Sequence, residues 1–207
     1  MARPRVIVVG PLQMNCYLWP CAPDKCLVVD PGAEPGRIVD ELEGLGLTPA
    51  AVALTHGHPD HLGAAGELAR RYGVPVYLQP DDNLWIELLK SDWMPDFGPR
   101  PDYWPEFTAY TDLLDYPELK LQILPLPGHS PGSVVLYSVR DACACVGDVL
   151  FAGGIGRTDL PGGDEEQLFR GLRETLFELP PSTEILPGHG PATNLARERA
   201  VNPFVTW

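Results

Sequence analysis

All five histidines of the sequence lie in three short loops, and each loop follows an apolar run that predicts a strand. Residues 55–61 read THGHPDH and hold three of them, while the other two stand in PGHS at 127–130 and PGHG at 187–190. A Pro-Gly turn after a strand fixes a short loop from which an imidazole can project. The chain must therefore fold with three histidine loops at strand ends, a pattern that favours convergent ligands over a structural cluster.

The THGHPDH loop has the residue types of a metal site. His56 and His58 can direct two imidazoles at one ion, because Gly57 between them has no side chain. Asp60 and His61 follow at once and could serve a second ion nearby. Imidazole and carboxylate ligands suit zinc, iron or manganese. Structural zinc sites are usually cysteine-rich, so this set favours a catalytic centre over a structural one.

Asp148 is a further carboxylate candidate, in CVGDVLF at 145–151 after an apolar run. It is either an ordinary turn aspartate at a strand end or a ligand that bridges two metals. The residue by itself leaves both interpretations open.

The rest of the chain alternates apolar, strand-like runs with helical patterns, which predicts layered α/β architecture rather than a bundle or a barrel. Asp30-Pro31-Gly32 is expected to break the chain after the third strand. The predicted strands are 5–9, 16–19, 26–30, 50–55, 74–78, 119–124, 133–139, 142–146 and 183–186. The predicted helices are 34–45, 62–72, 82–89, 164–179 and 192–200.

Residues 80–117 interrupt this alternation with eight aromatic residues and several prolines. After the short helix, the segment is expected to be an insertion with little regular structure. It could cover the core, form a subunit interface, or line a substrate pocket, since concave sites are commonly lined by aromatic side chains.

Charge and cysteine usage exclude several classes of protein. The net charge is −13, with 28 acidic and 15 basic residues, which is a poor match for a nucleic-acid backbone. Five cysteines at irregular spacing do not form a disulfide framework and are expected to be buried, reduced thiols. No apolar run approaches the ~20 residues of a membrane helix, and no signal sequence is visible. We expect a cytoplasmic protein without a membrane or nucleic-acid partner.

THGHPDH, PGHS, GD and PGHG, in this order over most of the chain, resemble the metallo-β-lactamase superfamily. The resemblance implies a four-layer αββα sandwich, with residues 1–207 forming one domain and metals bound between the sheets at one edge. It also implies ligands for two ions. The first would be bound by His56, His58 and His129, the second by Asp60, His61 and His189, and Asp148 would bridge them.

Details within the resemblance narrow the function. Asp148 stands where classical β-lactamases of this fold often carry cysteine, which argues against antibiotic hydrolysis, and His58 replaces the glutamate of flavodiiron relatives. GGIGRTDLPGGD at 153–164 and NPFV at 202–205 resemble the small glyoxalase II-like group, whereas GRTD is also similar to persulfide dioxygenases. Full-length glyoxalase II enzymes carry a C-terminal helical domain that helps to hold glutathione. This sequence ends at Trp207, so the carrier thiol stays open.

The resemblance implies a dinuclear hydrolase of small-molecule thioesters, with zinc as the first choice of metal and iron or manganese as alternatives. Asp60 would orient the attacking hydroxide. Arg157 either binds a substrate carboxylate or pairs with Asp159. The alternative is an oxygenase with one ferrous iron on His56, His129 and Asp148. A homo-oligomer is possible.

Overall fold

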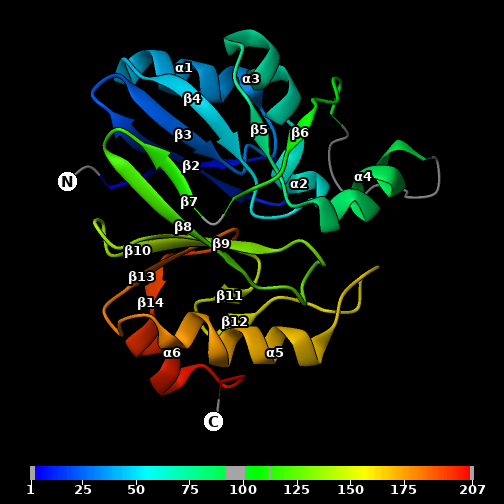
Figure 1. The fold of residues 1–207 in the computed structure, drawn as a ribbon, viewed down its shortest axis with the longest axis vertical. Coiled ribbons are helices and arrows are strands. Elements are labelled where there is room, and N and C mark those ends of the chain that lie inside the picture. Colours follow the sequence, from blue (N-terminus) through cyan, green and yellow to red (C-terminus); the bar gives the residue numbers. More distant parts are fainter. Residues whose placement is uncertain (1–2, 92–100, 112, 206–207) are drawn as a thin grey trace.

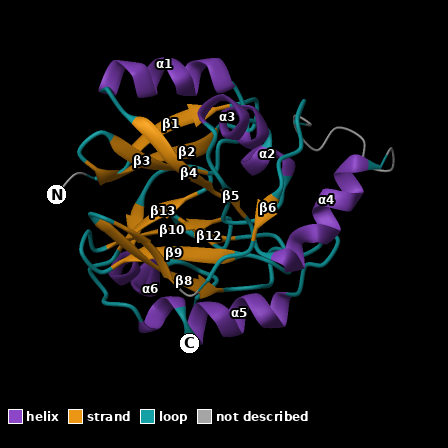
Figure 2. Ribbon diagram, turned by 45° about the horizontal axis from the view of Figure 1, so that its top comes forward, coloured by secondary structure: helices purple, strands orange, loops and turns teal. Residues whose placement is uncertain are grey.

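Two six-stranded sheets pack face to face, and helices cover the outer face of each sheet in the computed structural model (Figures 1 and 2). The structure describes residues 3–91, 101–111 and 113–205. Helices α1 and α3 lie over one sheet, and α5 and α6 over the other. This arrangement is the four-layer αββα sandwich that the sequence predicts.

The first sheet has the order β1-β2-β3-β4-β5-β6. The pairs from β3 to β6 are all parallel, so the carboxyl ends of these strands meet at one edge of the sheet. The strands are β1 (Arg5–Val9), β2 (Met14–Ala22), β3 (Lys25–Val29), β4 (Thr48–Ala53), β5 (Val76–Tyr77) and β6 (Phe107–Thr108).

The second sheet has the order β14-β13-β10-β9-β8-β7, in which β10 and β13 are parallel and the other neighbours antiparallel. A separate hairpin joins β11 (Leu150–Phe151) to β12 (Gly154–Ile155). The sheet strands are β7 (Leu113–Tyr116), β8 (Leu119–Pro125), β9 (Val134–Ser138), β10 (Cys143–Gly147), β13 (Glu184–Pro187) and β14 (Thr193–Asn194).

Strand β2 is buried on both sides because the sandwich covers both faces of its sheet. Cys16 and Leu18 pack under the outer helices, whereas Tyr17 and Trp19 pack between the two sheets. Successive side chains of a strand point to opposite faces, so a strand with both faces covered needs a continuous apolar run.

The helices are α1 (Pro35–Leu45), α2 (Pro59–Leu62), α3 (Ala65–Tyr72), α4 (Asn83–Lys90), α5 (Glu165–Glu174) and α6 (Leu195–Val201), with short 3₁₀ turns η1 (Pro80–Asp82) and η2 (Leu176–Glu178).

The single helix predicted over 62–72 is wrong at its start. The chain forms α2 and then α3, with a break at Gly63 and Ala64. The backbone N–H of Ala64 donates to the carbonyl of Pro31 instead of continuing α2. A hydrogen bond to a distant loop therefore interrupts the helix that the apolar pattern predicts.

Two other predicted helices are shorter than expected. The one predicted over 164–179 ends as α5 at Glu174, and a 3₁₀ turn follows. The one predicted over 192–200 begins only at Leu195, because Thr193 and Asn194 pair with β13 as β14. Asparagine at the helix start accepts a hydrogen bond from the backbone of Arg197, which is the usual role of this residue type there.

The segment 80–117 is more regular than predicted. Strand β6 adds to β5 and strand β7 adds to β8, so the segment supplies an edge strand to each sheet. Trp85 and Tyr110 are buried. Trp93 and Phe97 lie outside the described residues. The described part therefore covers and extends the core.

All five cysteines are buried and unpaired, as the sequence predicts. Cys143 and Cys145 share one face of β10 and pack between the sheets. Within residues 3–91, 101–111 and 113–205, no helix is long and apolar enough to cross a membrane.

Candidate metal centre

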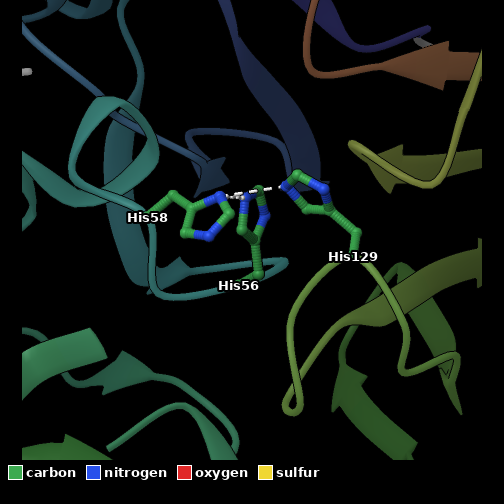
Figure 3. A group of neighbouring side chains, drawn as sticks. All are labelled: His56, His58 and His129. Atoms are coloured by element: carbon green, nitrogen blue, oxygen red, sulfur yellow. Dashed lines mark hydrogen bonds between the residues drawn. The ribbon is translucent and has the colours of Figure 1, made fainter. Parts of the chain in front are cut away.

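Three histidine side chains meet at the edge where strands β4 and β8 end (Figure 3). His56 and His58 follow β4, and His129 follows β8. Nε2 of His56 lies 3.0 Å from Nδ1 of His58, and Nε2 of His129 lies 2.9 Å from the same atom. Nitrogens about 2.0–2.1 Å from a tetrahedral ion would be roughly 3.3 Å apart. The spacing therefore suits three ligands of one ion.

A second group lies beside the first. Asp60 and His61 stand on α2, and His189 follows β13. Nε2 of His189 is 3.1 Å from Oδ2 of Asp60, and Nε2 of His61 is 3.9 Å from the same oxygen. These three residues can also hold one ion between them.

Asp148 lies between the two groups, directly after β10. Its Oδ1 is 3.4 Å from Nε2 of His61. Its Oδ2 is 3.6 Å from Nε2 of His189 and 3.8 Å from Nε2 of His129. The structure thus brings together all seven residues that the sequence suggests as metal ligands.

The donor atoms at the centre of this cluster fit bound cations. Nε2 of His61 and Oδ1 of Asp148 are buried and have no hydrogen-bond partner among the described residues. Leaving such groups unsatisfied costs about 1–3 kcal/mol each, and more where the group is charged. Imidazole and carboxylate ligands at this spacing suit divalent ions such as zinc, iron or manganese.

Hydrogen bonds orient four of the imidazoles. In each case Nδ1 faces an oxygen of the protein and leaves Nε2 directed at the cluster. The partners of His56, His61, His129 and His189 are Thr55 Oγ1 (3.1 Å), Asp30 Oδ2 (3.0 Å), the Arg157 carbonyl (2.8 Å) and the Leu12 carbonyl (3.0 Å). Such bonds fix the tautomer with Nδ1 protonated and expose the lone pair of Nε2 to a metal.

Asp30 is a site residue that the sequence analysis missed, because it treated Asp30-Pro31-Gly32 only as a chain break. Its carboxylate is buried and accepts hydrogen bonds from the backbone N–H and hydroxyl of Thr55, both at 2.7 Å. Its Oδ2 also faces Nδ1 of His61. Asp30 therefore orients His61 directly and His56 through Thr55. The signal was available in part, since Asp30 ends an apolar strand as Asp148 does.

The comparisons with known proteins agree with this geometry. The family model described as "Metallo-beta-lactamase superfamily" matches residues 9–189. The chain belongs to this superfamily. Among curated proteins it is 40% identical to "Probable metallo-hydrolase YqgX" of Bacillus subtilis, over 97% of this chain and 96% of that protein. It is 35% identical to "Hydroxyacylglutathione hydrolase GloC" of Haemophilus influenzae, again over 97% and 96%.

Three solved structures have the same fold. BLEG-1, a B3 metallo-β-lactamase, has a TM-score of 0.88 and 32% identity over 99% of this chain and 100% of that chain. TTHA1623 in a di-iron-bound form has a TM-score of 0.86 and 38% identity over 97% and 99%. ETHE1 from Myxococcus xanthus has a TM-score of 0.77 and 27% identity over 98% and 84%. The chain is thus similar over most of its length to proteins with different names.

The electrostatics of the cluster divide the imidazoles into two kinds. Burial, together with neighbouring imidazoles, lowers the pKa of His56 and His58 well below the ordinary value. Burial opposes protonation of His61 too, but the carboxylates of Asp148, Asp30 and Asp60 raise its pKa well above the ordinary value. Burial also opposes protonation of His189, whose pKa is raised through its bond to Asp60. In the metal-free protein, His61 and His189 therefore hold a proton up to a higher pH than His56 and His58 do.

This difference predicts that metal binding depends on pH. A histidine with a raised folded-state pKa stabilises the metal-free protein below its unfolded pKa, and this contribution is lost as pH rises through the folded value. Metal must displace these protons, at a cost of about 1.4 kcal/mol per proton for each pH unit below the folded pKa. We expect the difference in melting temperature between metal-loaded and metal-free protein to shrink from pH 8 to pH 6, measured at constant free metal. A constant difference would show that no proton is displaced.

An open pocket of about 260 Å³ gives access to the cluster. Leu12 and Leu160 form apolar parts of its wall, and Arg157 supplies its one described cationic side chain apart from the histidines. The Arg157 guanidinium donates two hydrogen bonds of 2.7 Å to the carboxylate of Asp159, and both side chains are largely exposed. The ion pair that the sequence offers as one role for Arg157 is therefore present, and the residue also borders the pocket.

Proposed function

We propose that this protein is a dinuclear metal-dependent hydrolase that cleaves thioesters of the hydroxyacyl-glutathione type. The observation that carries the proposal is the arrangement of seven histidine and aspartate side chains as two ligand groups around Asp148, at the wall of an open pocket. The relative named hydroxyacylglutathione hydrolase supports the substrate class, because it matches this chain over nearly the full length of both.

The ligand sets of the proposal are those that the resemblance implies. His56, His58 and His129 would hold one ion, and Asp60, His61 and His189 the other, with Asp148 between them. Two divalent ions bound there would supply activation of water near neutral pH and polarisation of the acyl carbonyl. Zinc is our first choice, and iron or manganese would serve the same set.

The chain's own groups complete the proposed reaction. The carboxylate of Asp60 borders the pocket, where it can accept a hydrogen bond from the attacking water and orient it. Each of the five histidines belongs to a ligand group, so none is left to protonate the leaving group. A thiolate is a stable leaving group that needs little such help, whereas an alkoxide or amine needs more. The set of residues therefore suits a thioester.

Arg157 is the residue that we propose for binding a carboxylate of the substrate. Replacing it with alanine is expected to raise KM about 10- to 150-fold with little change in kcat, because a charge-assisted hydrogen bond of about 1.5–3 kcal/mol would be lost from bound substrate and transition state alike. Steady-state kinetics measure the effect. Asp159→Asn is the matched control, since it frees the guanidinium and should leave KM equal or lower. An unchanged KM in Arg157→Ala would remove this residue from the substrate site.

Two other reactions remain worth testing. An oxygenase would need a single ferrous iron on His56, His129 and Asp148, a set of two histidines and one carboxylate with open positions. The similarity to BLEG-1 makes a β-lactam the second substrate class to assay.

The direct test is release of free thiol from S-lactoylglutathione by the metal-loaded protein. His56→Ala serves as the control, because His56 lies with His58 and His129 in the first group and also close to His61 and Asp148. Fast release that the substitution abolishes would support the proposal. Absence of release from protein with two bound ions would contradict it, and oxygen uptake with glutathione persulfide would then test the oxygenase.

A further inference from the structure

Asp82 is a buried carboxylate next to the metal centre, and it belongs to neither ligand group. It ends the turn η1, and its side chain is fully buried. Its Oδ2 accepts hydrogen bonds from the backbone N–H of Gly57 at 2.6 Å and from the hydroxyl of Ser130 at 2.9 Å. Its Oδ1 accepts from the backbone N–H of Gly132 at 2.6 Å. One carboxylate thus joins the loop that follows β4 to the loop that follows β8.

These two loops carry the three histidines of the first group. Gly57 lies between His56 and His58, and Ser130 directly follows His129. The loops belong to different sheets, one after β4 and the other after β8. The carboxylate of Asp82 is therefore a hydrogen-bond acceptor that both histidine loops share.

Both glycines press directly against Asp82. A Cβ on Gly132 would lie 2.7 Å from Cγ of Asp82, and a Cβ on Gly57 would lie 3.1 Å from its Cβ. Real side chains essentially never approach as closely as the first of these distances, and the second is tight. The packing is therefore built for a close approach of both backbones to this one carboxylate.

We propose that Asp82 is a positioning residue that sets the separation of the two loops and thereby the affinity of the ion held by His56, His58 and His129. The inference rests on the proposed metal site and not on the substrate. Trp85, three residues later, packs its ring on His58 with centroids 4.0 Å apart. Trp85, in the segment 80–117, thus packs against a histidine of the first group.

The second group has a separate anchor on another strand. Asn15 of β2 donates from Nδ2 to the carbonyl of Pro187 at 3.0 Å and to that of Gly190 at 2.8 Å. These bonds enclose His189, which belongs to the second group only. Among the residues that the structure describes, Asp82 makes no hydrogen bond to this loop, so the two anchors are expected to act on different ions.

Asparagine cannot replace Asp82 in this setting. Each carboxylate oxygen faces a backbone N–H donor, one from Gly57 and one from Gly132. An amide has only one oxygen, and its NH₂ group would face the remaining donor. Asp82→Asn therefore keeps the shape of the side chain but releases one of the two loops.

The test is competition between the protein and a chromophoric chelator for Co²⁺. Asp82→Asn is expected to keep one ion at wild-type affinity and to weaken the other about 10–100-fold, the usual effect of losing a group that orients ligands. Asn15→Ala should also weaken one ion only, and the double variant should weaken both. Asp81→Asn is the matched control, because Asp81 is an exposed neighbour whose replacement changes the charge equally.

If Asp82→Asn binds each ion as tightly as Asp81→Asn does, the proposal is overturned. A uniform loss of both ions together with a lower melting temperature would also overturn it, because that result indicates a structural role alone. If Asp82→Asn does not fold, Ser130→Ala removes one of the three bonds and should weaken one ion in the same direction by a smaller factor. If the wild-type protein binds no Co²⁺, the metal site and this proposal are both wrong. If the protein binds Co²⁺ but releases no thiol from S-lactoylglutathione, the proposed substrate is wrong and this proposal still stands.

Discussion

Replacing Asp148 with asparagine is expected to lower the rate of thioester hydrolysis about 10³-fold, equivalent to about 4 kcal/mol of transition-state stabilisation. Asp148 lies within 3.4–3.8 Å of imidazole nitrogens from both ligand groups. Burial opposes its ionisation, but the surrounding imidazoles of His61, His129 and His189 hold its pKa far below the ordinary value. The site is thus built around a negative charge that the amide lacks.

The Asp148→Asn experiment needs both kinetics and a metal count. We expect one ion fewer per chain, or the same number with much lower affinity for one of them. Asp115→Asn is a suitable control, since that carboxylate is exposed and its ion pair within the described part of the chain is with Lys120, at 4.0 Å. A variant that keeps two tightly bound ions and the wild-type rate would show that Asp148 does not bridge the two groups.

Removal of metal is expected to lower the melting temperature by about 10–20 °C. Each ion present at about 100 times its dissociation constant stabilises the folded state by about 2.7 kcal/mol, so two contribute about 5 kcal/mol. For a chain of this size, 1 kcal/mol shifts the melting temperature by about 2–4 °C. Thermal unfolding before and after treatment with a chelator measures the change, and re-addition of zinc should restore it.

The same experiment has an internal control in His56→Ala. That variant should show a smaller response to the chelator, because it lacks a proposed ligand of the first group. A wild-type protein whose melting temperature is insensitive to the chelator would contradict a resident metal centre.

The residues of the candidate cluster could be picked out from the sequence because they stand in short, chemically distinctive motifs. THGHPDH and the two Pro-Gly-His loops stand directly after apolar runs, and strands β4, β8 and β13 end where those runs end. The alternation of strands and helices predicts layered α/β architecture, and the four-layer sandwich is what the resemblance to the superfamily implies. These features depend on short stretches of chain.

The elements that the sequence did not reveal depend on contacts between distant segments. Asp30 and Asp82 look like ordinary loop residues, and their role exists only because β3, β4 and β5 end side by side. The break before α3 follows from a hydrogen bond between Ala64 and Pro31. The edge strands β6 and β7 are too short for an alternating pattern, so pairing with β5 and β8 defines them.

Anomalous X-ray scattering from crystals of metal-loaded protein, recorded at the absorption edge of the bound metal, shows whether two ions share one site around Asp148. We expect two peaks, one among His56, His58 and His129 and one among Asp60, His61 and His189. Asp148 should contact both peaks. A single peak on His56, His129 and Asp148, or a peak away from these residues, would contradict the dinuclear account.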